Sequence, residues 1–205
     1  MARAITTADL AHRVDDEAKA PFILDVRARD QYEAWQISGA VTPETINIPY
    51  WTAIEEDDET KAMLPEDRDV VVVCAKGDTS EMIVDIFGMA NLSNLDGGMD
   101  EWATTLVPRS LHDDGRQFVI QIDRIAKACL SYAVGERGEE MAVIDPAADI
   151  DAYLAIAEDM HATITHVFDT HLHADHVSIA RELADRTGAT YHISEGDAID
   201  AAFEY

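Results

Sequence analysis

The stretch DVVVVCAKGDTS, residues 69–80, decides the fold of the first half of the chain. Four consecutive valines form a short run of β-branched residues, which predicts a strand buried on both faces. The polar, glycine-containing loop after Cys74 leads into TSEMIVDIFGMANL (79–92). Its apolar spacing predicts a helix that Thr79 or Ser80 caps.

The same alternation continues on both sides of this stretch. Strand or extended patterns occur at PFILDV (21–26) and ETINIPY (44–50), and helical patterns at ARDQYEAW (28–35), WTAIEEDDETKAML (51–64) and around Met99 within NLDGGMDEWATTL (94–106). Strands that alternate with helices predict an α/β domain, with a parallel sheet covered by helices on both faces. We therefore expect a first domain over residues 1–107, followed by a polar linker over 108–116.

The second domain, residues 117–205, has a different pattern. The runs FVIQID (118–123), CLSYAVG (129–135) and MAVID (141–145) are separated by polar turns, which predicts a meander of strands. A helix over 148–160, a strand over 164–170, a helix ending at Gly188 and a strand over 189–194 follow.

The charge of the chain excludes some classes of protein. There are 41 acidic and 15 basic residues, four of them lysine, for a net charge of −26; the residues up to 107 carry 22 acidic and 8 basic, and the rest 19 and 7. A uniformly acidic, lysine-poor surface is typical of proteins kept soluble in concentrated salt, where the Debye length falls to about 3 Å at 1 M. We interpret it as halophilic adaptation. Nucleic-acid binding is disfavoured, because phosphates would be repelled.

Apolar runs and cysteines indicate the compartment. No apolar run approaches the roughly 20 residues of a membrane helix, and the acidic start MARAITTADLAHRVDDE has no hydrophobic signal core. The two cysteines do not form a disulfide framework. We expect a soluble cytoplasmic protein that does not bind membranes.

Cys74 is the first candidate catalytic residue. It follows a buried strand and precedes a tight loop and a helix N-terminus, whose backbone amides form a cradle for anions. The same positive field stabilises a thiolate, which is the nucleophilic form of cysteine. A buried structural cysteine is the alternative, and these residues alone leave both open.

Several motifs in order, LDVRARDQYEAWQISGAVTPETINIP, VVVVCAKGDTS and LDGGMDEW, resemble a rhodanese domain. The resemblance implies that Cys74 carries a sulfane sulfur as a persulfide and passes it to a thiol or cyanide. It also implies a structural or gating role for Asp25 and Arg27. The substrate-binding loop would comprise Ala75, Lys76, Gly77, Asp78, Thr79 and Ser80. Rhodanese loops often carry two arginines, whereas this loop has one lysine and an added carboxylate, which weakens binding of dianionic thiosulfate.

The segment HLHADH (171–176) is the second candidate site. His171, His173, Asp175 and His176 are imidazole and carboxylate ligands of the kind that bind zinc or iron, and a loop between a strand and a helix can direct them at common centres. The isolated His166 is interpreted as structural.

In its context, AVIDPAADIDAYLAIAEDMHATITHVFDTHLHADHVSIARELADRTGA, the segment resembles the opening half of a metallo-β-lactamase-fold domain, closest to the persulfide dioxygenase and glyoxalase II branch. The resemblance implies a partial αββα sandwich. It also implies either one iron, bound through His171, or two zinc ions, with His171 and His173 at one and Asp175 and His176 at the other. Further ligands are expected after Tyr205, so the site would be incomplete within residues 1–205. We do not assign His192 as a missing ligand.

These observations favour a protein of sulfur metabolism, in which persulfide sulfur transfer at Cys74 is coupled, in the complete protein, to metal-dependent oxidation of a persulfide to sulfite. The first alternative is a dinuclear glyoxalase II-like hydrolase with an accessory rhodanese domain. The second is a sulfur-carrier module with an inactive metal half-site. The expected partners are a small-molecule sulfane sulfur donor and a thiol acceptor; a homo-oligomer is compatible with the sequence.

Overall fold

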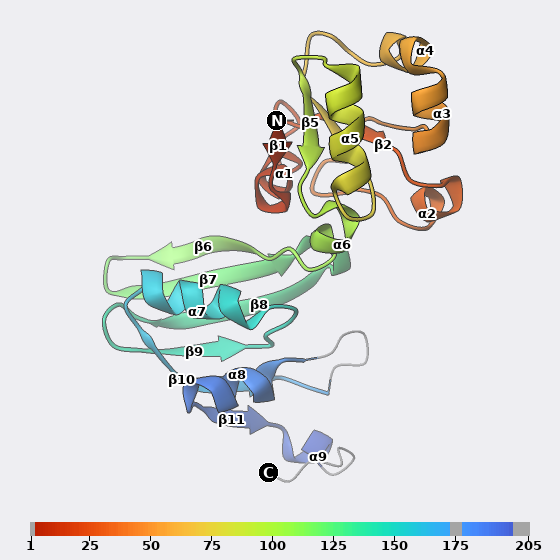
Figure 1. Ribbon diagram of the computed structural model, residues 1–205. Helices are drawn as coiled ribbons and strands as arrows, with labels where there is room; N and C mark the ends of the chain where they lie inside the picture. The colour runs from red at the N-terminus through yellow and green to blue at the C-terminus, as the bar shows by residue number, and fades with distance from the viewer. Residues whose placement is uncertain (1–2, 173–177, 199–205) are drawn as a thin grey trace. The chain divides into compact units, whose positions relative to one another are not determined.

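A computed structural model of the chain describes residues 3–172 and 178–198 (Figure 1). The chain divides between Thr105 and Leu106 into two compact units, called unit 1 and unit 2 below. No helix among the described residues has both the length and the apolar character needed to cross a membrane.

Unit 1 contains a parallel sheet in the strand order β1-β5-β4-β2-β3. Its strands are β1 (Ala4–Ile5), β2 (Phe22–Asp25), β3 (Thr45–Asn47), β4 (Val70–Val73) and β5 (Leu92–Leu95). All four valines of β4 are at most 1% exposed, so both faces of this central strand are covered. The predicted α/β class with a parallel sheet is confirmed.

Helices flank this sheet (Figure 1): α1 (Thr7–Arg13), α2 (Arg29–Ala34), α3 (Tyr50–Glu55), α4 (Asp57–Ala62), α5 (Asp78–Phe87) and α6 (Gly98–Trp102). The predicted acidic helix over 51–64 is divided at Glu56, where the backbone leaves helical geometry (φ −118°, ψ 50°). Three carboxylates follow directly in the first turn of α4. Because a helix N-terminus favours negative charge, this acidic run stabilises a new helix start rather than a helix interior.

Unit 2 contains a six-stranded sheet in the order β11-β10-β9-β8-β7-β6. The strands β7 (Gln117–Arg124), β8 (Cys129–Glu136) and β9 (Glu140–Ile144) form the predicted meander, which is antiparallel, and β6 (Val107–Asp113) adds a further antiparallel strand beside β7. The short 3₁₀ helix η1 (Ile125–Lys127) joins β7 to β8. The helix α7 (Ile150–Asp159) lies between β9 and the strand β10 (Thr163–Asp169), which is parallel to β9. The helix α8 (Ala180–Thr187) lies between β10 and the strand β11 (Thr190–Ile193), which is parallel to β10, and α9 (Glu195–Ala198) follows.

The predicted linker over residues 108–116 is wrong for most of its length, because residues 107–113 form β6 and pair with β7. The strand is polar because it lies at the edge of the sheet, where most of its side chains face water while its backbone is still paired. Polarity alone therefore does not distinguish a linker from an edge strand.

Both helices α7 and α8 pack on one face of this sheet, in a core that contains Phe118, Met141, Val167 and Leu183. Tyr153 lies fully buried in that core, with its hydroxyl oxygen 2.8 Å from Ser131 Oγ. The hydroxyl also accepts a hydrogen bond of 2.9 Å from the backbone N–H of Ala147. It therefore joins α7 to β8 and to the loop after β9.

Replacing Tyr153 with Phe should lower the free energy of unfolding of unit 2 by about 1–3 kcal/mol, because the buried N–H of Ala147 loses its acceptor and Ser131 Oγ keeps only the longer bond to the carbonyl of Ile122. Burial also raises the pKa of Tyr153 above its ordinary value of 10.0. The unfolded chain therefore releases this proton first, and the stability that the neutral phenol provides is lost as the pH rises above 10.0. The difference between wild type and variant should shrink in that range. Urea unfolding at several pH values measures both effects. Tyr132→Phe, at a half-buried tyrosine, is the control, and an equal effect there would contradict this role.

Candidate functional site

Cys74 lies at the carboxyl end of β4, directly before the loop that leads into α5. It is 5% exposed. The backbone N–H of Gly77 donates a hydrogen bond to Cys74 Sγ over 3.1 Å, and the Ser80 hydroxyl lies 3.1 Å from the same sulfur. The same hydroxyl also lies 3.0 Å from the carbonyl oxygen of Gly77, so its single proton can point at either acceptor. The backbone N–H of Gly77 and the Ser80 hydroxyl are thus both in reach of one buried sulfur, an arrangement that favours negative charge there.

The loop holds this shape because a second segment, residues 97–100, packs closely against it. Gly77 has a φ of +96°, and a Cβ there would lie 3.0 Å from the nitrogen of Gly97. At Gly98 (φ +59°) a Cβ would lie 2.6 Å from the carbonyl oxygen of Cys74. The next two backbone N–H groups, of Met99 and Asp100, donate to the carbonyls of Cys74 and Ala75 over 3.0 and 2.9 Å. The glycines of LDGG therefore permit the close backbone approach that fixes the cysteine loop.

The predicted loop residues divide into two groups. Gly77 and Ser80 are buried beside the sulfur, as shown above. Lys76 and Asp78 are exposed, and Ala75 and Thr79 are half-buried. The loop thus offers the sulfur backbone and hydroxyl donors, while its one cation and one carboxylate face water.

Asp25 and Arg27 form a buried ion pair at the end of the neighbouring strand β2. The guanidinium donates from Nε and Nη2 to the Asp25 carboxylate over 2.6–3.1 Å, and Nη2 also donates to the carbonyl of Trp35 over 2.6 Å. The side chains are 6% and 2% exposed for Arg27 and Asp25. These hydrogen bonds tie the end of β2 to the carbonyl of Trp35, directly after α2.

The second predicted site is described only in part. His171 follows β10 and is exposed, whereas His173, Asp175 and His176 lie outside the described residues. Within residues 3–172 and 178–198, no three His, Cys, Asp or Glu side chains lie close enough together to hold a metal ion.

A hydrogen-bonded chain fixes the orientation of His171. The Thr170 hydroxyl donates to Asp145 Oδ2 over 2.7 Å, and the Thr170 backbone N–H donates to Oδ1 over 2.7 Å. Since that hydroxyl has a single proton, its oxygen accepts the bond from His171 Nδ1, at 2.8 Å. For a neutral imidazole this bond selects the tautomer with the lone pair on Nε2, the form that ligates zinc or iron. The described part of the segment therefore fits the implied metal.

Asp169 holds the chain on both sides of the histidine segment. Its buried carboxylate accepts hydrogen bonds of 2.7 Å from the hydroxyls of Ser178 and Tyr191. Ser178 also forms an isolated bridge to Ala147. Asp145, Asp169 and Thr170 were not among the site residues predicted from the sequence. All three are polar residues at strand ends, where side chains that hold a loop by hydrogen bonds are common.

His192 lies on β11 beside His166 of β10, with 2.9 Å between His166 Nδ1 and His192 Nε2. Its ring stacks on Phe168 at 4.4 Å. These packing contacts agree with the structural interpretation of His166 and give no reason to assign His192 to the metal segment.

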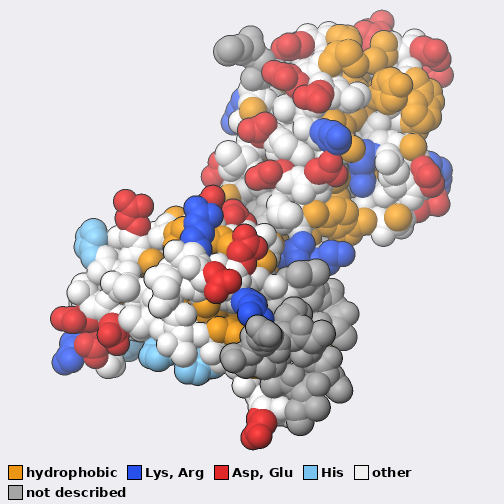
Figure 2. All heavy atoms as spheres, turned by 60° about the horizontal axis from the view of Figure 1, so that its bottom comes forward, with side chains coloured by type: hydrophobic (Ala, Val, Ile, Leu, Met, Phe, Trp, Pro, Cys, Tyr) orange, Lys and Arg blue, Asp and Glu red, His pale blue; other side chains and the backbone are white. Residues whose placement is uncertain are grey.

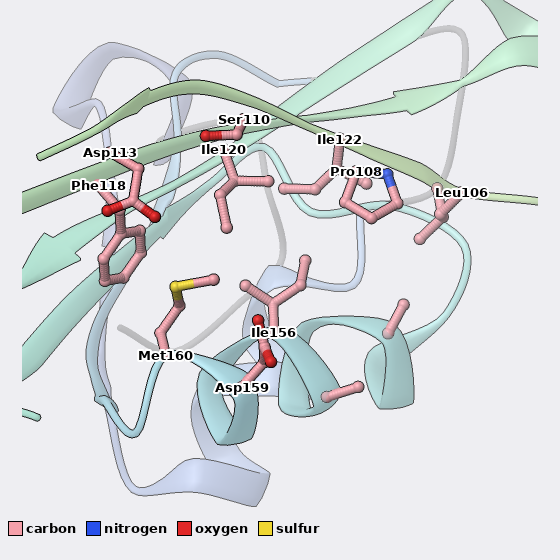
Figure 3. A pocket seen from close by; sticks show the side chains of 12 residues that line it. Leu106, Pro108, Ser110, Asp113, Phe118, Ile120, Ile122, Ile156, Asp159 and Met160 are labelled. Carbon is pink, nitrogen blue, oxygen red and sulfur yellow. The ribbon is translucent and has the colours of Figure 1, made fainter. Parts of the chain in front are cut away.

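Unit 2 also contains a cavity of about 440 Å³ between α7 and the strands β6 and β7 (Figure 3). Phe118, Ile120 and Ile122 point into it from the sheet, opposite Ile156 and Met160 of α7. None of the predicted site residues lines it, so it belongs to neither candidate site.

Comparison with known proteins gives matches to both halves. Residues 6–105 match the family Rhodanese-like domain, and residues 124–201 match the Metallo-beta-lactamase superfamily. The adenylyltransferase and sulfurtransferase UBA4 of Scheffersomyces stipitis is 28% identical over 114 residues, which are 51% of this chain and 25% of that protein. The chain thus spans a quarter of the length of that curated relative.

Two solved structures are each similar to a part of this chain. A rhodanese-related protein of Thermoplasma volcanium is 27% identical, with 49% of this chain and 89% of that chain covered and a TM-score of 0.39. ETHE1 of Myxococcus xanthus is 31% identical, with 42% and 34% covered and a TM-score of 0.31. From the family matches, the chain consists of a rhodanese-like domain followed by a metallo-beta-lactamase-superfamily segment.

Proposed function

We propose that unit 1 is a sulfurtransferase in which Cys74 carries the sulfur. The observation that carries this proposal is the pair of donors, Gly77 N–H and Ser80 Oγ, at 3.1 Å from one buried sulfur. The sulfurtransferase named among the relatives supports it.

The transfer has two balanced steps. The Cys74 thiolate attacks the outer sulfur of a donor R–S–SH, the S–S bond of the donor breaks, and R–S⁻ leaves, so that Cys74 holds S–SH. An acceptor thiolate then attacks that terminal sulfur, and Cys74 leaves as a thiolate. The two donors stabilise Cys74 whenever it is anionic, which is the state at the start and at the end. Because Lys76 is the loop's one cation, we propose a persulfide rather than thiosulfate as the natural donor.

Replacing Cys74 with Ser should abolish persulfide formation, since no other atom at this position can form the S–S bond. Mass spectrometry after exposure to a small persulfide should show one added sulfur on wild type and none on the variant. Cys129→Ser is the control and should keep the added sulfur. Transfer that persists in Cys74→Ser would contradict the assignment of the nucleophile.

Replacing Ser80 with Ala should slow transfer about 10- to 100-fold, because a hydrogen bond to a charged group contributes about 1.5–3 kcal/mol and each 1.4 kcal/mol is a factor of ten. Stopped-flow assay of sulfur transfer to a small thiol measures this rate. Ser110→Ala, on the edge strand β6, is the control. An unchanged rate in Ser80→Ala would show that its contact with the sulfur has no role in the chemistry.

We further propose that the metallo-beta-lactamase-superfamily segment, in the complete protein, oxidises a low-molecular-weight persulfide. Iron would supply activation of dioxygen, and the overall reaction is R–S–SH + O₂ + H₂O → R–SH + SO₃²⁻ + 2 H⁺. His171 would be a ligand through Nε2, with His173, Asp175 and His176 as the further candidates for an iron or dinuclear zinc site. The fusion supports this reading, since unit 1 handles the same chemical group that the metal segment would consume.

Replacing Thr170 with Val should weaken metal binding about 10- to 100-fold, because the residue that orients His171 loses its hydroxyl. Competition with a chelator, followed by metal analysis, measures the affinity without reference to catalysis. Thr187→Val, where the hydroxyl donates to a helix carbonyl, is the control. Equal metal affinity in Thr170→Val and wild type would mean that the hydrogen bonds of Thr170 have no role at the metal site.

The metal and the reaction together distinguish the two candidate functions of this segment. Bound iron with oxygen consumption would support persulfide oxidation, whereas two bound zinc ions with thioester hydrolysis would support the hydrolase alternative.

A further inference from the structure

The outward side of α5 begins one turn from the nucleophile. Ser80, in its first turn, lies 3.1 Å from Cys74 Sγ. Farther along the helix, Ile83, Val84 and Phe87 are buried against the sheet, while Met82 and Ile86 are 43% and 46% exposed. Since residues four apart lie on the same side of a helix, Met82 and Ile86 form one apolar pair, and Glu81 and Asp85 form an acidic pair beside it.

The apolar and acidic pairs, together with Asp78, line one shallow hollow. We call it the α5 surface; its residues are Asp78, Glu81, Met82, Asp85 and Ile86. In the described part of unit 1, all of the exposed large hydrophobic residues lie on α3, just after α4 or on α5: Tyr50, Trp51, Met63, Met82 and Ile86. The helices α3 and α5 cover the same face of the sheet, since both contribute to one core cluster. Figure 2 shows hydrophobic side chains gathered in one region of the surface of unit 1, with carboxylates near them.

The burial of Cys74 limits how an acceptor reaches it. With 5% of the residue exposed, the sulfur is accessible only to a slender group that enters the loop. A thiol on a protruding protein segment satisfies this requirement. The rest of such a segment would lie against the neighbouring α5 surface, which an apolar side chain flanked by basic ones complements in both shape and charge.

We propose that the α5 surface is the docking site of a protein that exchanges sulfur with Cys74, and that the contacting segment combines an apolar anchor with lysine or arginine. The inference rests on the sulfurtransferase function proposed above and names the class of its partner. In the transfer itself, the partner's cysteine thiolate attacks the terminal sulfur of Cys74–S–SH. The S–S bond then breaks, Cys74 leaves as a thiolate, and the partner becomes a persulfide.

The test uses the full chain, loaded with sulfur by a small persulfide and then desalted. Three acceptors are compared: a short peptide with one cysteine flanked by leucine and lysines, the same peptide with glutamates in place of the lysines, and 2-mercaptoethanol. The rate at which Cys74 loses its extra sulfur is followed by mass spectrometry. We expect the basic peptide to react about tenfold faster than the acidic one, the lower range for electrostatic steering.

Two double variants separate the contributions of this surface. Met82→Gln with Ile86→Gln removes the apolar pair, and Glu81→Gln with Asp85→Asn removes the acidic pair. Each should slow transfer to the basic peptide about three- to tenfold and leave transfer to 2-mercaptoethanol unchanged. A matched control, Glu158→Gln with Glu182→Gln, removes the same charge from exposed positions of unit 2 and should have no effect.

The outcomes distinguish the two proposals. Equal slowing by the control variant would mean that the acidic chain attracts basic peptides everywhere, and would overturn the docking site. Unchanged rates in both double variants would overturn it as well. Failure of the wild type to transfer sulfur even to 2-mercaptoethanol would instead overturn the sulfurtransferase function itself.

Discussion

The site in unit 1 depends on one backbone contact, the pair of hydrogen bonds that Met99 and Asp100 donate to the carbonyls of Cys74 and Ala75. These bonds hold the carbonyls at the start of the loop, and the N–H of Gly77, two residues after Ala75, donates to Cys74 Sγ. The contact is possible only because residue 98 is a glycine, since a Cβ would lie 2.6 Å from the Cys74 oxygen. Any larger residue would move the loop and, with it, the donors that stabilise the thiolate.

In unit 2, side-chain hydrogen bonds rather than backbone hydrogen bonds hold the candidate site. The histidine segment follows the carboxyl end of β10, between parallel neighbours, as Cys74 follows β4. Asp145 holds the start of the segment through Thr170, and Asp169 holds the chain after it through Ser178. Loops at the carboxyl ends of parallel strands are the usual place for ligand sites, because neighbouring strands bring their loops to a common edge. Both candidate sites follow this rule, each with its own polar anchors.

The sequence predicted the elements well where burial sets the pattern. The valines of β4 and the apolar-rich runs of β7, β8 and β9 are typical of buried strands. The type and the order of these elements could therefore be inferred from the sequence. It failed where exposure removes the pattern, as in β6, and where charge divides a helix, as at Glu56. The anchors of the sites could not be inferred, because Gly98 and Asp145 lie 24 and 26 residues from Cys74 and His171 along the chain. These residues matter because the fold brings them close to Cys74 and His171, and spacing along the chain does not show such proximity.

The acidity of the chain affects how much the exposed apolar side chains would contribute to binding a partner. If the interpretation as a halophilic protein holds, the working ionic strength is high and the Debye length falls to about 3 Å at 1 M. Attraction between Glu81 or Asp85 and a basic partner would then act only near contact. Concentrated salts that are excluded from protein surfaces strengthen the burial of apolar groups, so Met82 and Ile86 would provide more of the affinity under those conditions. In the proposed docking, the acidic pair would mainly select among partners already held by the apolar pair, and this division of roles would account for exposed methionine and isoleucine on so acidic a chain.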